Sequence, residues 1–282
     1  MRKRKRLGQH FLISGKVANR IINFSHINLK DVVIEVGAGK GALTRQLIKK
    51  ASQVIAIEID SFYSDYVKNE FSGANNFIVI NEDILKVNIS DILKQYEVGS
   101  EVVKIIGNIP FSITSPLIDW LITQRINIAQ ATLMLQKEFA ERLITQRGEK
   151  AYGKLSVIAD LYFFKKYGFD VKRNMFRPIP KVDASVIQLS PRYELSLPLE
   201  EKDVELFIEF LNYCFSYPRK TLLKNIQLAV GSKKDINLKK EIIDAIGELN
   251  LSECVRANEL TLENFYSMYI YLKAKNCYGR KE

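Results

Sequence analysis

The segment from residue 32 to residue 50 constrains the fold of this chain more than any other. Residues 32–36, Val-Val-Ile-Glu-Val, form a short apolar run that ends at Gly37, and the pattern from Ala42 to Lys50 is helical. A short apolar run, a glycine turn and an amphipathic stretch are typical of a strand, a turn and a helix in succession. We therefore predict a β–turn–α unit here.

Similar apolar runs recur farther along the chain, with helical stretches between several of them. The runs are 54–59, 77–80, 102–106, 131–135 and 185–189, and the helical stretches lie around 61–71, 115–124 and 137–146. Alternation of this kind predicts a mostly parallel sheet with helices on both faces, which is the α/β class. No internal repeat interrupts it.

The pattern changes after a polar link that Pro191 and Pro198 flank. Beyond the link, apolar residues share single helical faces: Val204, Phe207, Ile208 and Leu211 on one, and Phe265, Met268, Tyr269 and Leu272 on another. Such faces are typical of packed amphipathic helices. We predict two domains, an α/β domain at 1–195 with a basic N-terminal arm and a small all-α domain at 196–282.

Composition excludes several classes of protein. The chain has 282 residues, 47% of them hydrophobic and 26% charged, which is ordinary for a soluble globular protein. No apolar run approaches the length of a membrane span. Three cysteines and two histidines, widely spaced, predict neither a disulfide framework nor a metal site. We expect a cytoplasmic protein, and a monomer.

The formal net charge of +10 is concentrated in two places. Residues 1–30 hold eight Lys and Arg and no carboxylate, whereas residues 200–282 hold 13 basic and 13 acidic residues. A second basic cluster consists of Lys165, Lys166, Lys172, Arg173, Arg177 and Lys181, against a lone Asp170. Two local patches predict a polyanionic partner, since each phosphate contact releases counterions. For the arm alone, a solubilising face or a mitochondrial presequence is the alternative.

Residues at the ends of the first three predicted strands predict a nucleoside-containing ligand. Gly37, Gly39 and Gly41 allow a tight turn and a close approach of the backbone to a ligand. Glu58 ends the second strand and can accept hydrogen bonds from the hydroxyls of a ribose, and Asp83 follows the third run and can accept from an adenine amino group. A dinucleotide and a different nucleoside cofactor both fit these residues.

The fourth apolar run ends in Gly107-Asn108-Ile109-Pro110-Phe111, which favours methyl transfer to an exocyclic amine over hydride transfer. The N6 lone pair of adenine is delocalised into the ring, which makes the amine a poor nucleophile. Acceptors must therefore accept hydrogen bonds from the N6–H groups as the methyl group arrives. The side-chain oxygen of Asn108 and a carbonyl at Ile109 or Pro110 can do so. Pro110 stiffens this array, and Phe111 offers a ring for stacking. The alternative for this tetrapeptide is a strand-terminating turn.

Taken together, these residues resemble the ribosomal RNA adenine-N6 dimethyltransferases, and most of all their housekeeping small-subunit type. The segments that carry the resemblance are Gly8–Leu12, Glu35–Gly41, Glu58–Asp60, Asn108–Phe111, Leu135–Glu138, Tyr152–Val157, Phe176–Asp183 and Phe215–Leu222. The resemblance implies a Rossmann-like sheet that binds S-adenosylmethionine through residues near these strand ends: Gln9, His10, Leu12, Gly37, Gly39, Glu58, Asp83 and Asn108. Because the resemblance already begins at Gly8, it argues against the presequence, and we expect no cleaved leader.

The resemblance also implies the substrate, two neighbouring adenosines of the 3′-terminal hairpin of small-subunit rRNA in a pre-ribosomal particle, each methylated twice. Phe176 would cover the flipped adenine opposite Phe111, although a lone Phe is more often a core residue. RNA contacts are expected from basic residues of the arm, the second cluster and the C-terminal domain, namely Arg4, Lys5, Arg6, Arg173, Arg177, Lys181, Arg219 and Lys220.

The chain departs from the family at three positions. Phe111 stands where the family usually has Tyr, and His10 where it often has Asn, so the role of the His10 side chain is open. Tyr217-Pro218 stands where the family often has Gln or Arg, which leaves the RNA contacts of that turn open.

Three other functions remain as alternatives. The first is a resistance methyltransferase of the same family that acts on large-subunit rRNA, and Tyr152–Val157 and Phe215–Leu222 favour the housekeeping type over it. The second is a non-catalytic ribosome-assembly or transcription factor on this fold, against which the intact Asn108 tetrapeptide argues. The third is a nicotinamide oxidoreductase, which only the glycine loop supports.

Overall fold

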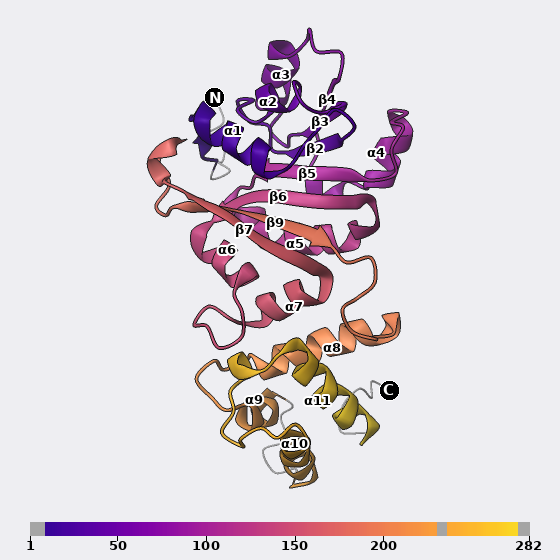
Figure 1. The fold of residues 1–282 in the computed structure, drawn as a ribbon, viewed down its shortest axis with the longest axis vertical. Helices are drawn as coiled ribbons and strands as arrows, with labels where there is room; N and C mark the ends of the chain where they lie inside the picture. Colours follow the sequence, from indigo (N-terminus) through magenta and orange to yellow (C-terminus); the bar gives the residue numbers. More distant parts are fainter. Residues whose placement is uncertain (1–8, 230–235, 276–282) are drawn as a thin grey trace, which may run out of the picture. The chain divides into compact units, whose positions relative to one another are not determined.

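A seven-stranded sheet organises the first part of the chain (Figure 1). The computed structural model describes residues 9–229 and 236–275. The strand order is β4-β3-β2-β5-β6-β9-β7. The strands are β2 (Val32–Val36), β3 (Gln53–Ile57), β4 (Phe77–Ile80), β5 (Val103–Asn108), β6 (Ile128–Gln136), β7 (Phe163–Val171) and β9 (Ala184–Pro191).

The strands from β4 to β6 are all parallel to their neighbours, which confirms the predicted α/β class. From β2 the chain proceeds to β3 and β4 on one side, and β5 and β6 lie on the other. The strand order therefore reverses between β2 and β5. Ligands of open α/β sheets bind at the carboxyl ends of the strands at such a switch point, which predicts where the site should lie.

The far edge of the sheet differs from the prediction. Both β9 and β7 pair antiparallel, β9 with β6 and β7 with β9. We did not predict β7, whose sequence Phe-Phe-Lys-Lys-Tyr-Gly-Phe-Asp-Val is rich in charge. As an edge strand it is buried at Phe163, Phe169 and Val171 but partly exposed between them, so its residues lack the continuous apolar run of the central strands.

The helices of this region are the following: α1 (Gly15–Phe24), α2 (Thr44–Leu47), α3 (Ser61–Glu70), α4 (Ile89–Gln95), α5 (Thr114–Thr123) and α6 (Lys137–Ile144). Helix α2 is shorter than the predicted 42–50, and neither α1 nor α4 was predicted. Helix α1 begins where the side chain of Ser14 accepts a hydrogen bond from the backbone N–H of Val17. Its residues Ala18, Ile21 and Ile22 are buried in a core cluster shared with Leu12 and Phe176.

A second, two-stranded sheet brings together residues that are far apart in the sequence. Strand β1 (Phe11–Leu12) pairs antiparallel with β8 (Phe176–Arg177), so that Leu12 lies opposite Phe176. The backbone N–H of Ile13 also donates to the carbonyl oxygen of Met175 at 2.9 Å. The segment that begins at Gln9 is thereby held next to the one that carries Phe176.

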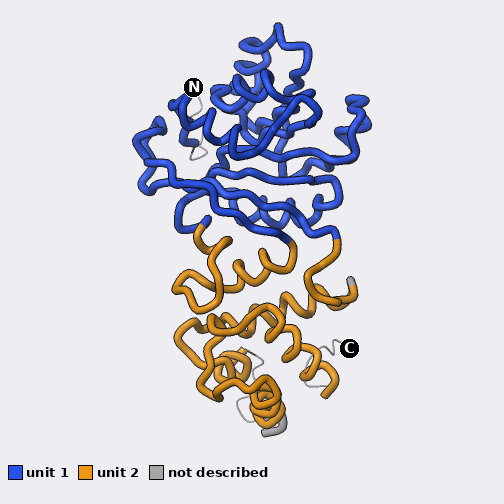
Figure 2. The backbone as a smooth tube through the Cα atoms, viewed as in Figure 1, with its two compact units in different colours: residues 1–140, 163–193 blue, residues 141–162, 194–282 orange. Residues whose placement is uncertain are grey.

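The chain divides into two compact units (Figure 2). Unit 1 is Met1–Ala140 with Phe163–Tyr193, and unit 2 is Glu141–Tyr162 with Glu194–Glu282. The expected boundary at 195/196 lies near the division at 193/194, but residues 141–162, which we expected in the first domain, group with the C-terminal helices. The assignment of cofactor binding to one domain and RNA binding to the other stays a prediction.

The helices of unit 2 are α7 (Lys154–Tyr162), α8 (Glu201–Cys214), α9 (Leu222–Ala229), α10 (Ile236–Glu248) and α11 (Leu262–Ala274). The predicted apolar faces are buried here, with Phe207 and Leu211 on α8 and Phe265 and Met268 on α11. Thr261 and Asn264 form a capping box that starts α11. The C-terminal part of the chain is helical, as predicted.

Candidate active site

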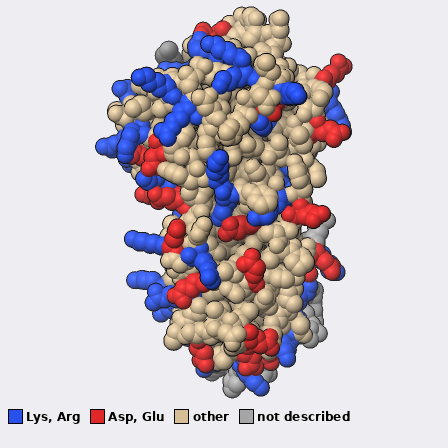
Figure 3. All heavy atoms as spheres, viewed as in Figure 1, with Lys and Arg blue, Asp and Glu red and all other residues tan. Residues whose placement is uncertain are grey.

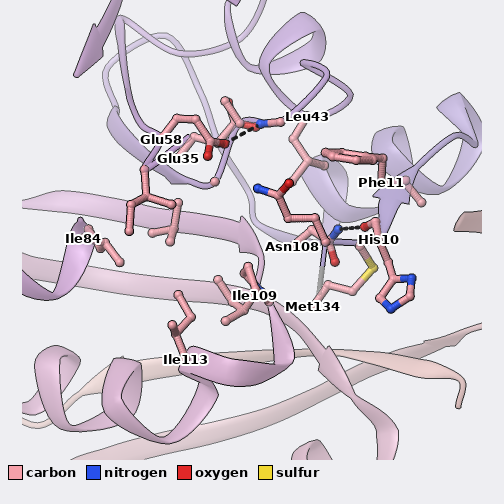
Figure 4. A pocket seen from close by; sticks show the side chains of 18 of the residues that line it. His10, Phe11, Glu35, Leu43, Glu58, Ile84, Asn108, Ile109, Ile113 and Met134 are labelled. Carbon is pink, nitrogen blue, oxygen red and sulfur yellow. Dashed lines mark hydrogen bonds between the residues drawn. The ribbon is translucent and has the colours of Figure 1, made fainter. Parts of the chain in front are cut away.

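A pocket with a volume of about 140 Å³ opens at the carboxyl ends of β2, β3, β4 and β5, where the strand order reverses (Figure 4). Every residue that we predicted to catalyse the reaction or bind the cofactor lines it: Gln9, His10, Leu12, Gly37, Gly39, Glu58, Asp83, Asn108, Pro110, Phe111 and Phe176. All of them belong to unit 1. Their roles in binding and catalysis stay predictions.

The turn after β2 has the backbone conformation that glycine permits. Gly37 and Gly39 have φ angles of 72° and 54°, in the left-handed region that residues with a side chain rarely adopt. A Cβ atom at Gly39 would lie 3.0 Å from the ring of Phe11, which forms part of the pocket wall. The missing side chain therefore keeps open the space beside this ring.

Glu58 directly follows β3, and its carboxylate is held in the pocket wall. One oxygen accepts from the backbone N–H of Gly39 at 2.9 Å and the other from that of Asp60 at 3.0 Å. The residue is only 2% exposed. Burial raises the pKa of Glu58, and the two backbone hydrogen bonds oppose this effect. Each oxygen retains a lone pair that can accept from a ligand hydroxyl.

Glu35 is a pocket residue to which we assigned no role. It lies within β2, is 1% exposed, and accepts a hydrogen bond from the hydroxyl of Thr44 at 2.6 Å. Burial raises its pKa to about 7, the hydrogen bonds from Thr44 oppose the shift, and the negative charge of Glu58 adds to it. A carboxylate inside an otherwise apolar strand was the signal in the sequence that this position differs from its neighbours.

Asp83 follows β4 and reaches the same pocket. Its carboxylate accepts from the backbone N–H of Leu85 and begins a short 3-10 helix, Ile84–Lys86. Ile59 and Ile84 add apolar lining next to Glu58 and Asp83. We assigned no role to these two isoleucines from the sequence, although each directly follows a predicted acidic residue.

Asn108, the last residue of β5, is oriented by a contact with the N-terminal segment. Its side-chain nitrogen donates to the backbone carbonyl oxygen of His10 at 2.7 Å, a contact that Figure 4 shows beside the pocket. Because the NH₂ group is engaged in this way, the side-chain oxygen is left to accept from another partner. The ordering of the Asn108 amide thus depends on a residue 98 positions away.

The residues after Asn108 form a compact turn. The backbone N–H of Ile109 donates to the backbone carbonyl oxygen of Met134 in β6 at 3.0 Å. The carbonyl oxygen of Pro110 already accepts from the N–H of Ile113 at 3.1 Å and from the hydroxyl of Thr114 at 3.4 Å. Of the two carbonyls that we considered as acceptors, that of Pro110 is therefore already engaged within the turn.

Phe111 and Phe176 both line the pocket, but they differ in burial. Phe111 is partly exposed, whereas Phe176 is 2% exposed and packs in the core cluster with Leu12, Met134 and Ala184. Both interpretations of Phe176, as a core residue and as a pocket wall, therefore describe the same ring. Its stacking on a target base stays a prediction.

The second basic cluster contains a carboxylate that our charge count left out. Asp183 pairs with Lys172 at 3.0 Å and accepts from the backbone N–H of Arg173 at 2.9 Å. Side chains of Arg173, Arg177 and Lys181 are exposed, and Lys and Arg gather on the face of unit 1 in Figure 3. Asp183 lowers the net charge of this region and orders the backbone that carries it.

The other predicted RNA contacts are not part of the pocket. Arg219 and Lys220 are exposed and lie in unit 2, after α8. Arg4, Lys5 and Arg6 lie outside the described residues. Within the described ranges, no helix is long and apolar enough to cross a membrane, and no group of three His, Cys, Asp or Glu is close enough to hold a metal ion.

This geometry can hold a nucleoside on one side and accept the hydrogens of an amine on the other. Glu58 and Asp83 supply buried and half-buried acceptors next to the glycine turn. Asn108 supplies an amide whose nitrogen is engaged by His10, in a pocket that the ring of Phe111 also lines. Figure 4 shows Glu58 and His10 on opposite sides of Asn108.

Comparisons with known proteins agree with this chemistry. The sequence model of the family described as ribosomal RNA adenine dimethylase matches residues 1–273. A protein named ribosomal RNA small subunit methyltransferase A, from Mycoplasmopsis pulmonis, is 36% identical over 273 residues, which are 97% of this chain and 100% of that protein.

Two solved structures share the fold. A dimethyladenosine transferase from Plasmodium falciparum superposes with a TM-score of 0.76 at 30% identity and covers 95% of this chain and 98% of its own. The 23S rRNA methyltransferase ErmE superposes with a TM-score of 0.69 at 26% identity and covers 93% of this chain and 99% of its own.

Proposed function

Because the chain belongs to the ribosomal RNA adenine dimethylase family, we propose that it transfers methyl groups from S-adenosylmethionine to the N6 atoms of two adjacent adenosines near the 3′ end of small-subunit rRNA. The observation that carries the proposal is the shared pocket of Glu58, Asn108 and Phe111, in which the Asn108 amide is already oriented. Hydride transfer to or from a nicotinamide cofactor would give that amide no chemical role.

The pocket residues fit S-adenosylmethionine. The turn at Gly37 and Gly39 provides room that a Cβ atom at Gly39 would take, and the buried Glu58 carboxylate suits the two hydroxyls of a ribose. Asp83, with Ile59 and Ile84 beside it, suits the amino group and flat faces of an adenine. When bound, this cofactor supplies an electrophilic methyl group on a sulfonium.

The protein's own contribution is to prepare the target amine and hold it in line. The Asn108 side-chain oxygen and the Ile109 carbonyl accept the two N6 hydrogens and stabilise the positive charge that develops on the nitrogen. The ring of Phe111 stacks on the unpaired base, and the buried Phe176 closes the opposite wall. Alignment of the two reacting groups removes up to about 7–11 kcal/mol from the barrier.

Small-subunit rRNA is the substrate that we favour over large-subunit rRNA. The relative from Mycoplasmopsis pulmonis is named for the small subunit and matches 97% of this chain at 36% identity, whereas ErmE, named for 23S rRNA, matches at 26%. Arg173, Arg177 and Lys181 in unit 1, and Arg219 and Lys220 in unit 2, would contact RNA phosphates. The N-terminal Arg4, Lys5 and Arg6 would extend this contact.

The test is transfer of radiolabelled methyl groups to small ribosomal subunits that lack the modification, followed by nucleoside analysis. We expect N6,N6-dimethyladenosine from unmodified small subunits and no incorporation into subunits that are already dimethylated. Incorporation into 23S-type RNA alone would replace the proposed substrate with the large-subunit one. Binding without any incorporation would favour a non-catalytic assembly factor.

A further inference from the structure

His10 contacts three other residues at once, two of which line the pocket. Its backbone carbonyl accepts from the Asn108 side chain at 2.7 Å. Its ring lies against the ring of Phe111, with centroids 5.5 Å apart and planes tilted by 36°. Its Nδ1 atom lies 2.7 Å from the carbonyl oxygen of Pro178, two residues after Phe176.

The contact with Pro178 determines which nitrogen of His10 carries a hydrogen. A carbonyl oxygen can only accept, so Nδ1 must be the donor. This hydrogen bond anchors the imidazole ring to the segment that follows β8. The anchored ring in turn packs on Phe111, which is partly exposed and has no hydroxyl of its own with which to bond to a neighbour.

We propose that the His10 side chain is a positioning residue for the target base, in that it holds the Phe111 ring in place from the Pro178 carbonyl while its backbone orients Asn108. This inference rests on the proposed methyl transfer. Different atoms of His10 thereby have different functions: the backbone carbonyl orients Asn108, and the imidazole positions Phe111. Only the second is lost when the side chain is changed.

The test is a double-mutant cycle between His10 and Phe111. We expect His10→Ala to lower kcat/KM for the RNA substrate by roughly 2- to 12-fold, the range of a single aromatic contact. The dissociation constant of S-adenosylmethionine should change by less than about 2-fold, because the backbone carbonyl remains. In a Phe111→Leu background, His10→Ala should have no further effect on kcat/KM, because the ring that it positions is gone.

Two conservative variants and a matched control sharpen the test. His10→Phe keeps a ring but loses the donor to Pro178, and His10→Gln keeps a donor but loses the ring, so neither should restore the wild-type rate in full. The control is Tyr63→Leu. Tyr63 makes a similar ring contact, but with Phe11 and not with Phe111, at a centroid distance of 4.8 Å. Its effect should add to that of Phe111→Leu.

The outcomes separate this inference from the proposed function. Additive effects of His10→Ala and Phe111→Leu on kcat/KM in an active enzyme would overturn the positioning role alone. Urea denaturation of the wild type, His10→Ala, Phe111→Leu and the double variant measures the coupling between the two residues without any substrate. Coupling in the free energy of unfolding, together with no transfer by the wild type, would support the contact and reject the proposed function. No coupling in either measurement would reject the inference.

Discussion

The two walls of the pocket are built in different ways. On the wall that we propose for the cofactor, the cofactor wall, Gly37, Glu58 and Asp83 each follow a strand of the parallel part of the sheet, so the fold places them side by side. On the wall that we propose for the target base, the target wall, Asn108 is held by His10, and Phe176 is positioned by the pairing of β8 with β1. The first wall depends on strand ends alone, and the second on contacts between distant segments.

The walls also differ in charge. The cofactor wall contains two buried carboxylates, Glu35 and Glu58, whereas the target wall presents an amide, carbonyls and aromatic rings. Buried carboxylates suit ligand hydroxyls and cationic groups, and neutral acceptors suit an uncharged aromatic amine. We therefore expect substitutions on the cofactor wall to change cofactor affinity and stability, and those on the target wall to change the rate of transfer.

The largest effect should follow from Asn108→Ala. Loss of one preorganised hydrogen-bonding group at the developing charge lowers kcat by about 100- to 1,000-fold in comparable enzymes. Single-turnover transfer to unmodified small subunits measures the rate. Asn108→Asp is the matched variant, since a carboxylate accepts but cannot donate to the His10 carbonyl, and it should also be slow. Unchanged turnover of Asn108→Ala would remove this residue from the mechanism.

The next effect concerns the buried charge of the cofactor wall. Because the pKa of Glu35 is raised from 4.5 to about 7, the folded state keeps a proton that the unfolded chain has lost in this window. The contribution of this residue to the free energy of unfolding should therefore fall by roughly 3 kcal/mol as the pH rises from below 4.5 to above 7, with most of the fall between these two values.

Glu35→Gln removes this titration while its amide oxygen can still accept from Thr44. The variant should match the wild type near pH 4.5 and exceed its stability at pH 8. Urea denaturation at both pH values measures the difference. An equal pH dependence in both proteins would show that Glu35 is not the group responsible.

A smaller effect is expected at Glu58. Glu58→Gln replaces one carboxylate oxygen, a charged hydrogen-bond acceptor, with an NH₂ group. This change should weaken S-adenosylmethionine binding by about 10- to 100-fold. Equilibrium binding to the free protein measures this change. Asp60→Asn is the matched control, because Asp60 caps α3 next to Glu58 but does not line the pocket. A loss of affinity only in the control would contradict the division between the two walls.

The smallest effect is expected at Phe111. Replacement by Ala removes a stacking ring and should lower kcat/KM for RNA by about 5- to 100-fold, with little change in cofactor affinity. Phe111→Tyr keeps the ring and should retain most of the activity. A larger loss of cofactor binding than of RNA turnover would place Phe111 on the cofactor wall instead.

Much of the fold was predictable because its strands are buried. The run Val32–Val36 matches a fully buried strand, since covered parallel strands have continuous apolar sequences. The run Phe77–Ile80 also matches a strand, β4, whose apolar residues are half-buried at the other edge of the sheet. The edge strand Phe163–Val171 was missed for the opposite reason. The division into compact units at 140/141 and 162/163 had no sequence signal, because it depends on packing and not on linker composition.

The candidate site was predictable to the extent that each residue follows a strand. Glu58 and Asn108 could be chosen because residue type and strand-end position agree with a chemical need. The ring contact of His10 with Phe111 and the ordering of Arg173 by Asp183 could not be foreseen, since neither pair is close in sequence or periodic. No local pattern records a contact of that kind.

The sequence by itself determined the parallel sheet, the glycine turn and the set of acceptors at the strand ends, because local periodicity and residue chemistry encode these features. Only the tertiary structure decided which end of the Asn108 amide is bonded to His10 and which rings line the pocket. These properties come from the pairing of β1 with β8, and that pairing closes a loop of more than 160 residues between Leu12 and Phe176.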